Sequence, residues 1–221
     1  KGYGTMTLLD DVLESAALLQ QKVPDAILVG GTVAAYYAHH RESYDHDHVL
    51  KDLKSRYSAV LEALETLDNW ERSPRSRPPM TILGLLGDIP AGIRNLRREV
   101  PLEVEEIELP SGHHVTIPTI EEALRIKAFL LVNRNFDRDY VDVVALSDQL
   151  GVDTAANVLL NIDSYYPEFN GAVGDQLLEK LSCPQPEPNP RHDLYETRNL
   201  SPTYSSEYVS HACRSLAERM M

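Results

Sequence analysis

A short buried strand that ends on a glycine pair constrains the fold more than any other feature of the sequence. The run "AILVGG" is apolar up to Gly30 and Gly31, and the apolar spacing from Thr32 to His40 predicts a helix directly after the glycines. A glycine turn that leads into a helix presents free backbone N–H groups at the positive end of the helix dipole, where phosphate groups bind. The turn alone is a weak signal, and it gains weight from the residues that follow.

Residues 44–50 are predicted to form the second strand, and this strand carries two aspartates. Because alternate residues of a strand lie on one face, Asp45 and Asp47 are expected to share a face, with His46 and His48 on the other. Two carboxylates about 7 Å apart along a strand repel each other unless a cation lies between them. Mg²⁺ prefers one or two carboxylates together with substrate phosphates, so it is the expected ion, and a solvated strand edge is the alternative. The histidines lack zinc-ligand spacing.

The rest of the chain predicts an α+β protein. Further helices are predicted at residues 8–22, 53–67, 119–132, 137–150, 155–160, 174–181 and 204–220, and further strands at 80–86, 101–109 and 113–118. The basic segment 92–98 is predicted to be a short helix or turn. These elements give an α/β core at residues 7–118 and a helical C-terminal part at 119–221, with a proline-rich linker at 184–190.

The charge is acidic overall but basic in one region. The formal net charge of −13 argues against broad nucleic-acid binding, because phosphate contacts need cations. Between residues 72 and 98, however, the chain has a single acidic residue and six arginines, namely Arg72, Arg75, Arg77, Arg94, Arg97 and Arg98. These arginines form either a solvated surface or a local phosphate-binding strip.

Two further features of the sequence concern the cellular compartment in which the protein is expected. Cys183 and Cys213 lack metal-ligand spacing and fit free thiols in a reducing cytosol better than a disulfide. The chain has no charged-then-apolar leader and no apolar run near the length of about 18 residues that a membrane span needs. A cytoplasmic protein without a membrane span is therefore expected.

One acidic residue is predicted to be buried in the C-terminal part. The run "YVDVVAL" is apolar except for Asp142, and a helix that is apolar all round is buried. A buried carboxylate without a partner costs free energy, so Asp142 is expected to pair with Lys127 or Arg134 of the preceding helix. The pair is either a structural salt bridge or part of a site. Arg138 and Asp139 are expected to form a local cap and ion pair.

The two motifs together resemble a known superfamily. "GGT" followed by "DHD" resembles the nucleotidyltransferase superfamily, whose hallmark is Gly-Gly/Ser followed by DxD. The segment with Lys127, Arg134, Arg138 and Asp142 is similar to the signature of the AbiEii/AbiGii toxin family, which includes mycobacterial nucleotidyltransferase toxins of type IV toxin–antitoxin systems. The resemblance covers about residues 10–150. Thr32 stands where many relatives have serine.

The resemblance implies a site and a reaction. It implies Mg²⁺ or Mn²⁺ held by Asp45 and Asp47, with nucleoside triphosphate contacted by Gly30, Gly31, Thr32, Lys127 and Arg134. Asp142 either orients Lys127 or takes the proton of the attacking hydroxyl. A third carboxylate, common in the superfamily, is not obvious, and Glu103 and Glu105 are the candidates.

The acceptor implied by the resemblance is the 3′ end of tRNA, whose modification blocks aminoacylation and translation. The six arginines would then hold the acceptor stem, and a cognate antitoxin protein is a further expected partner. Two alternatives stay open. One is nucleotidylation (AMPylation) of a protein hydroxyl, for example on the antitoxin, and the other is a catalytically silent binding module.

Overall fold

The structure is a computed structural model that describes residues 7–167, 170–188 and 199–221. The chain divides into two compact units. The first unit comprises residues up to 33 together with 43–99 and 103–118, and the second comprises residues 34–42, 100–102 and 119–221.

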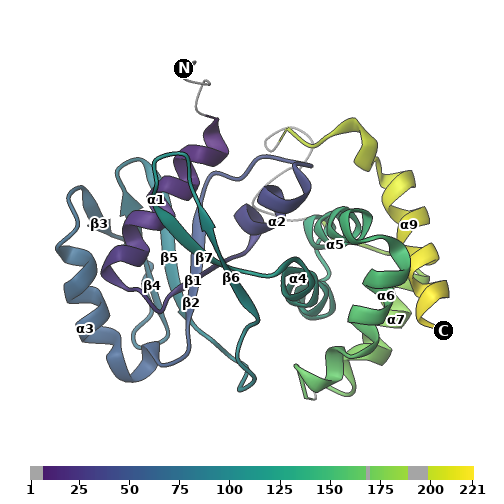
Figure 1. Cartoon of the computed structure of the whole chain (residues 1–221). Helices are drawn as coiled ribbons and strands as arrows, with labels where there is room; N and C mark the ends of the chain where they lie inside the picture. The colour runs from purple at the N-terminus through teal and green to yellow at the C-terminus, as the bar shows by residue number, and fades with distance from the viewer. Residues whose placement is uncertain (1–6, 168–169, 189–198) are drawn as a thin grey trace. The chain divides into compact units, whose positions relative to one another are not determined.

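The first unit contains a mixed five-stranded sheet with the strand order β1-β2-β5-β4-β3 (Figure 1). The bounds are β1 (Ile27–Val29), β2 (His46–Leu50), β3 (Trp70–Arg72), β4 (Thr81–Leu86) and β5 (Ile89–Asn95). β2 is parallel to β5, and the other neighbouring pairs are antiparallel. β6 (Val104–Glu108) and β7 (His114–Pro118), which fall within the predicted strands 101–109 and 113–118, form a separate antiparallel pair.

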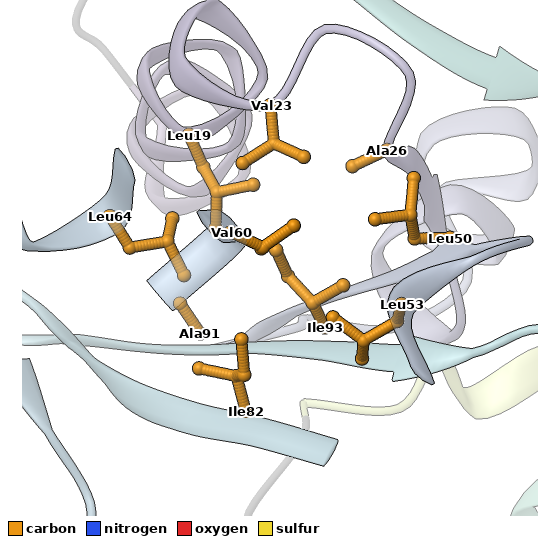
Figure 2. Packing of buried hydrophobic residues seen from close by; sticks show 10 residues of the cluster. All are labelled: Leu19, Val23, Ala26, Leu50, Leu53, Val60, Leu64, Ile82, Ala91 and Ile93. Atoms are coloured by element: carbon orange, nitrogen blue, oxygen red, sulfur yellow. The ribbon is translucent and has the colours of Figure 1, made fainter. Parts of the chain in front are cut away.

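Two helices of this unit, α1 (Leu8–Lys22) and α3 (Leu53–Glu65), cover one face of the five-stranded sheet. Figure 2 shows ten buried side chains packed together, from these two helices, from the strands and from the connection between α1 and β1, namely Leu19, Val23, Ala26, Leu50, Leu53, Val60, Leu64, Ile82, Ala91 and Ile93. Strand residues alternate between faces, so the residues between these core positions point to the opposite face of the sheet. That opposite face carries the predicted carboxylates.

The second unit is helical. Its elements are α4 (Ile120–Arg134), α5 (Asp137–Leu150), α6 (Val152–Leu160), α7 (Val173–Ser182), α9 (Ser206–Met220) and the short 3₁₀ helices η1 (Ile162–Ser164) and η2 (Pro202–Tyr204). The Thr119 side chain caps α4 by accepting a hydrogen bond from the backbone N–H of Glu122. Asn135 ends α4 in the left-handed region, and Gly151 at φ +84° separates α5 from α6.

The α+β prediction with a mixed sheet and flanking helices is confirmed. The prediction for residues 92–98 was wrong, because Gly92 to Asn95 belong to β5 and pair with strands on both sides. The proline-rich segment is extended, but backbone hydrogen bonds tie Glu187 to Asn135 and Asp137. Residues 189 and 190 of the predicted linker lie outside the described residues. Among the described residues, every helix is too short or too polar to cross a membrane.

Candidate active site

The two aspartates lie at the start of β2 on the face away from the core. His46 and His48 are fully buried, whereas Asp45 and Asp47 are partly exposed, which is the alternation expected of a strand. The Nε2 atom of His46 lies 2.9 Å from the Ser15 hydroxyl of α1. Burial lowers the pKa of His46 to about 4 and that of His48 well below its ordinary value, so both rings are neutral core residues.

A glycine of the neighbouring strand makes room for one of the carboxylates. Gly92 of β5 is the register partner of Asp47, and a Cβ atom at Gly92 would lie 2.8 Å from Asp47 Oδ1. Any larger residue at this position would therefore displace the carboxylate. Arg94, two residues further along β5, places its Nε 3.7 Å from the same Oδ1.

The glycine turn lies beside this pair. Gly30 has φ +87°, a conformation that favours glycine, and α2 (Gly31–Ala38) begins at the next residue. A Cβ atom at Gly30 would lie 3.8 Å from the Cβ atom of Asp47. The turn and the carboxylate, separate in sequence, therefore meet in the first unit.

Thr32 holds the backbone of this region. Its side chain is buried, and its hydroxyl donates a hydrogen bond of 2.6 Å to the backbone carbonyl of Asp45 and lies 2.9 Å from the Ser43 hydroxyl. A hydroxyl that is buried and engaged in this way positions Asp45. Any phosphate contact of Thr32 would therefore come from its backbone N–H.

The donor set fits a single hard divalent cation. Asp45 and Asp47 supply partly exposed carboxylate oxygens, and the missing side chain at Gly92 leaves room for the Asp47 carboxylate. Two carboxylates completed by substrate phosphates and water are the ligands that Mg²⁺ takes. Within the described part of the chain, no cluster of three or more metal-ligating side chains is present.

The third carboxylate of the superfamily has no counterpart on the two strands next to β2. β1 reads "ILV" and β5 reads "IPAGIRN", and neither contains an acid. Glu103 and Glu105 are exposed, and Glu105 lies in β6, which belongs to the separate two-stranded sheet. Neither residue therefore lies on a strand that borders β2.

A second polar cluster lies in the second unit around Asp142, which is fully buried. Its Oδ2 accepts hydrogen bonds from Lys127 Nζ at 2.7 Å and from Arg41 Nη2 at 2.8 Å. Its Oδ1 accepts from Arg41 Nε at 2.8 Å and from His40 Nε2 at 2.7 Å. The expected partner Lys127 is present, and sequence reasoning missed Arg41 and His40.

The charges of this cluster are strongly coupled. Burial alone would raise the pKa of Asp142, but the charges of Arg41 and Lys127 and the hydrogen bonds from Arg41 and His40 hold this pKa well below its ordinary value. Burial lowers the pKa of Lys127, and Asp142 opposes that shift. Burial likewise lowers the pKa of His40, so its ring is neutral near pH 7 and donates from Nε2.

Arg134 pairs with Asp139 and not with Asp142. Its Nε and Nη2 each lie 2.8 Å from an oxygen of Asp139, in a bidentate ion pair. Asp139 was expected to pair with Arg138 instead. The Arg138 guanidinium lies 5.7 Å from the centre of the Phe136 ring, and burial lowers its pKa. The α4–α5 pair is thus held by two separate salt bridges, Lys127–Asp142 and Arg134–Asp139.

The six arginines of the basic region differ in exposure. Arg72, Arg75, Arg77, Arg94 and Arg97 are exposed, whereas Arg98 is buried. The backbone of Arg77 forms an isolated β-bridge with Thr81 of β4, and Thr81 is the register partner of Arg94 in β5. Arg77 and Arg94 therefore lie in one row across the strands. Because Arg98 is buried, it does not belong to the exposed arginines that could form the predicted phosphate-binding strip.

Sequence comparison relates the chain to a segment of larger proteins. No family model matches the chain. It is 29% identical over 173 residues to the mycolic acid-containing lipids exporter MmpL11 of Mycolicibacterium smegmatis, a match that covers 76% of this chain. The chain spans about 15% of the length of that relative.

Comparison of structures relates the fold to nucleotidyltransferases. The nucleotidyltransferase toxin MenT4 of Mycobacterium tuberculosis matches with a TM-score of 0.64 and 15% identity, over 96% of this chain and 82% of the toxin. The structure of ANT(2″)-Ia with adenylyl-2″-tobramycin matches with a TM-score of 0.51 and 12% identity, over 72% of this chain and 98% of that chain. The resemblance to the nucleotidyltransferase superfamily is therefore confirmed at the level of the fold, and the chain is similar in fold to a mycobacterial toxin of that superfamily.

Proposed function

We propose that this protein transfers a nucleoside monophosphate from a nucleoside triphosphate to an acceptor hydroxyl. The observation that carries the proposal is the proximity of the Gly30 turn to Asp47 on the face of β2 away from the core, where Gly92 leaves room for the carboxylate. A helix N-terminus binds phosphate and a carboxylate pair binds a hard cation, and a metal–triphosphate substrate needs both.

In this proposal Asp45 and Asp47 hold Mg²⁺ or Mn²⁺, which when bound would neutralise charge on the phosphates. The backbone N–H groups of Gly31 and Thr32, at the first turn of α2, contact the phosphate oxygens, and Gly30 supplies the backbone conformation that aims them. The acceptor oxygen forms a bond to the α-phosphorus, and the bond from that phosphorus to the bridging oxygen breaks. Pyrophosphate leaves with the electron pair, and the hydroxyl proton passes to water.

Asp142 is proposed as a positioning residue and not as the proton acceptor. Both of its oxygens already accept hydrogen bonds from cationic or neutral donors, and its pKa lies well below the ordinary value. A carboxylate in that state is a weak base. We propose that it holds Lys127, whose ammonium neutralises phosphate charge during transfer. Arg134 is the weaker candidate for such a role, because Asp139 already binds its Nε and Nη2.

The proposed acceptor is the 3′ end of tRNA, with loss of aminoacylation as the consequence. The support is the fold similarity to the toxin MenT4 and the exposed arginines on the first unit. Because the net charge is −13, binding of RNA should be confined to this basic region and sensitive to salt. A cognate antitoxin protein is part of the same proposal.

The fold alone does not determine the acceptor, since ANT(2″)-Ia was solved with an adenylylated aminoglycoside. MmpL11 of Mycolicibacterium smegmatis is an exporter of mycolic acid-containing lipids, and the chain matches only about 15% of its length, so we do not propose lipid export for the chain. Nucleotidylation of a protein hydroxyl and a silent binding role are the alternatives that an experiment must separate.

The test is incubation of the purified protein with total tRNA and each α-³²P-labelled nucleoside triphosphate in turn, with Mg²⁺ or Mn²⁺. The proposal predicts labelled RNA, loss of the label after RNase treatment, and no labelling by Asp45→Ala. Asp88→Ala is the matched control, because Asp88 is an exposed acid of the same unit in the turn between β4 and β5. Label that survives RNase and stays with protein would favour the protein acceptor, and labelling by Asp45→Ala would contradict the site.

A further inference from the structure

The guanidinium of Arg94 lies beside Asp47, one of the two proposed metal-binding carboxylates. Arg94 Nε is 3.7 Å from Asp47 Oδ1, and the two side chains are 53% and 38% exposed. Both lie on the face of the sheet opposite the core, because Gly92 pairs with Asp47 and Arg94 follows Gly92 by two residues. The oxygen that Arg94 approaches is the one for which Gly92 leaves room.

The position of this arginine matters because β5 is the parallel neighbour of β2 in the sheet. An acid on β5 would add a third ligand to the pair, and the strand instead presents an arginine. A guanidinium near Asp47 neutralises part of the charge of two neighbouring carboxylates, which would otherwise repel each other. A divalent cation that binds Asp47 through Oδ1 must therefore compete with Arg94.

We propose that Arg94 is a built-in competitor of the metal: it pairs with Asp47 in the metal-free protein and is displaced to a substrate phosphate when the metal binds. A half-exposed arginine side chain is long enough to turn away without disturbing the strand. Guanidinium groups bind phosphate oxygens well. Arg94 is then a substrate-binding residue that couples metal binding to substrate binding at the proposed active site, and this inference rests on the proposed function.

The direction of the coupling follows from competition. Without substrate, the metal has to break the Arg94–Asp47 pair, so its affinity is lowered. With substrate, the displaced guanidinium gains a phosphate, so the metal and the substrate each strengthen the binding of the other. Metal held in this way is bound weakly until the phosphate-bearing substrate arrives.

The test is Mn²⁺ binding to the purified full chain, measured by electron paramagnetic resonance at about 0.1 M salt, where charges more than about 10 Å away are screened. Because a half-exposed ion pair is weak, Arg94→Ala should bind Mn²⁺ about 2- to 5-fold more tightly than the wild type. Arg94→Lys, which keeps the charge, should stay near the wild type. Arg219→Ala is the control for net charge, since Arg219 of α9 likewise forms an exposed ion pair, at 3.4 Å with Asp153, and it should leave Mn²⁺ affinity unchanged.

The outcomes separate this inference from the proposed function. If Arg94→Ala binds Mn²⁺ no more tightly than Arg219→Ala, the competition is refuted while the metal site stands. If neither the wild type nor Arg94→Ala binds Mn²⁺, and nucleoside triphosphate does not restore binding, the proposed function fails as well.

A second measurement identifies the ligand whose phosphate binds the displaced Arg94. Mn²⁺ binding is repeated with a non-hydrolysable nucleoside triphosphate, or with a short RNA that ends in CCA. The ligand that supplies the phosphate should tighten Mn²⁺ binding in the wild type by a larger factor than in Arg94→Ala. An equal factor in both proteins for both ligands would overturn the second half of the proposal.

Discussion

The buried carboxylate of α5 gives the sharpest prediction about stability. In Asp142→Asn the side chain keeps its size but loses its charge. Arg41 and Lys127, whose side chains are only 5% and 4% exposed, then lose their shared counter-charge. The variant should therefore be destabilised far more than an ordinary surface substitution.

The magnitude follows from the burial and the number of bonds. Asp142 accepts two hydrogen bonds on each oxygen, all of 2.7 or 2.8 Å. Removing one partner of a buried ion pair costs about 3–5 kcal/mol, because the other charge stays buried and unpaired. For a chain of this size, each kcal/mol lowers the melting temperature by about 2–4 °C, which gives a decrease of about 6–20 °C.

Lys127→Met provides a comparison on the same cluster. It removes one cation and leaves Asp142 with the bidentate Arg41 and His40, so it should cost less, about 1–2 kcal/mol. Asp153→Asn is the control, because Asp153 is a 74% exposed acid on α6 that faces an exposed arginine at 3.4 Å. Its cost should stay below about 0.5 kcal/mol.

The assay is urea unfolding at pH 7 followed by circular dichroism, with all variants measured at the same protein concentration. The reasoning is refuted if Asp142→Asn costs no more than Asp153→Asn. It is also refuted if Lys127→Met is the more damaging change, since the carboxylate would then not be the centre of the cluster.

Three further predictions concern the first unit. Gly92→Ala should weaken Mn²⁺ binding about tenfold or more, because its Cβ would lie 2.8 Å from the Asp47 carboxylate and would displace it. Unchanged Mn²⁺ binding would contradict the proposed role of Asp47 as a metal ligand beside Gly92. His46 and His48 have folded pKa values below the ordinary 6.5, so the unfolded chain takes up more protons as the pH falls below 6.5. The free energy of unfolding should fall by about 2 kcal/mol per histidine from pH 7 to pH 5, and equal urea midpoints at both values would refute this. Thr32→Val should lower the free energy of unfolding in urea by about 1–2 kcal/mol and should lower the transfer rate, because it loses the hydroxyl that binds the Asp45 carbonyl. Thr32→Ser keeps this hydroxyl and should keep the stability and the transfer rate of the wild type.

The sequence predicted what depends on local periodicity. The alternation of β2 placed Asp45 and Asp47 on one face and the two histidines in the core, because a strand has a period of two residues. The apolar run around Asp142 likewise predicted a buried acid that needs a cation. Both inferences need only the residues of one element.

The features that were missed depend on contacts between distant segments. Arg41 lies 101 residues from Asp142 in the sequence, and no local pattern relates them. The basic segment 92–98 was predicted to be a short helix or turn, but pairing with β2 and β4 makes residues 92–95 part of a strand. The importance of Gly92 follows from the same pairing, since only the register places it beside Asp47.

The most direct test of nucleotidyl transfer compares the position of the label in the nucleotide. The protein is incubated with Mg²⁺, total tRNA and a nucleoside triphosphate labelled on either the α- or the γ-phosphate, and released pyrophosphate is measured in parallel. The account predicts that only the α-label enters the acceptor, with one pyrophosphate released per label, and that Asp47→Asn abolishes both. Transfer of the γ-label, or transfer that survives Asp47→Asn, would contradict it.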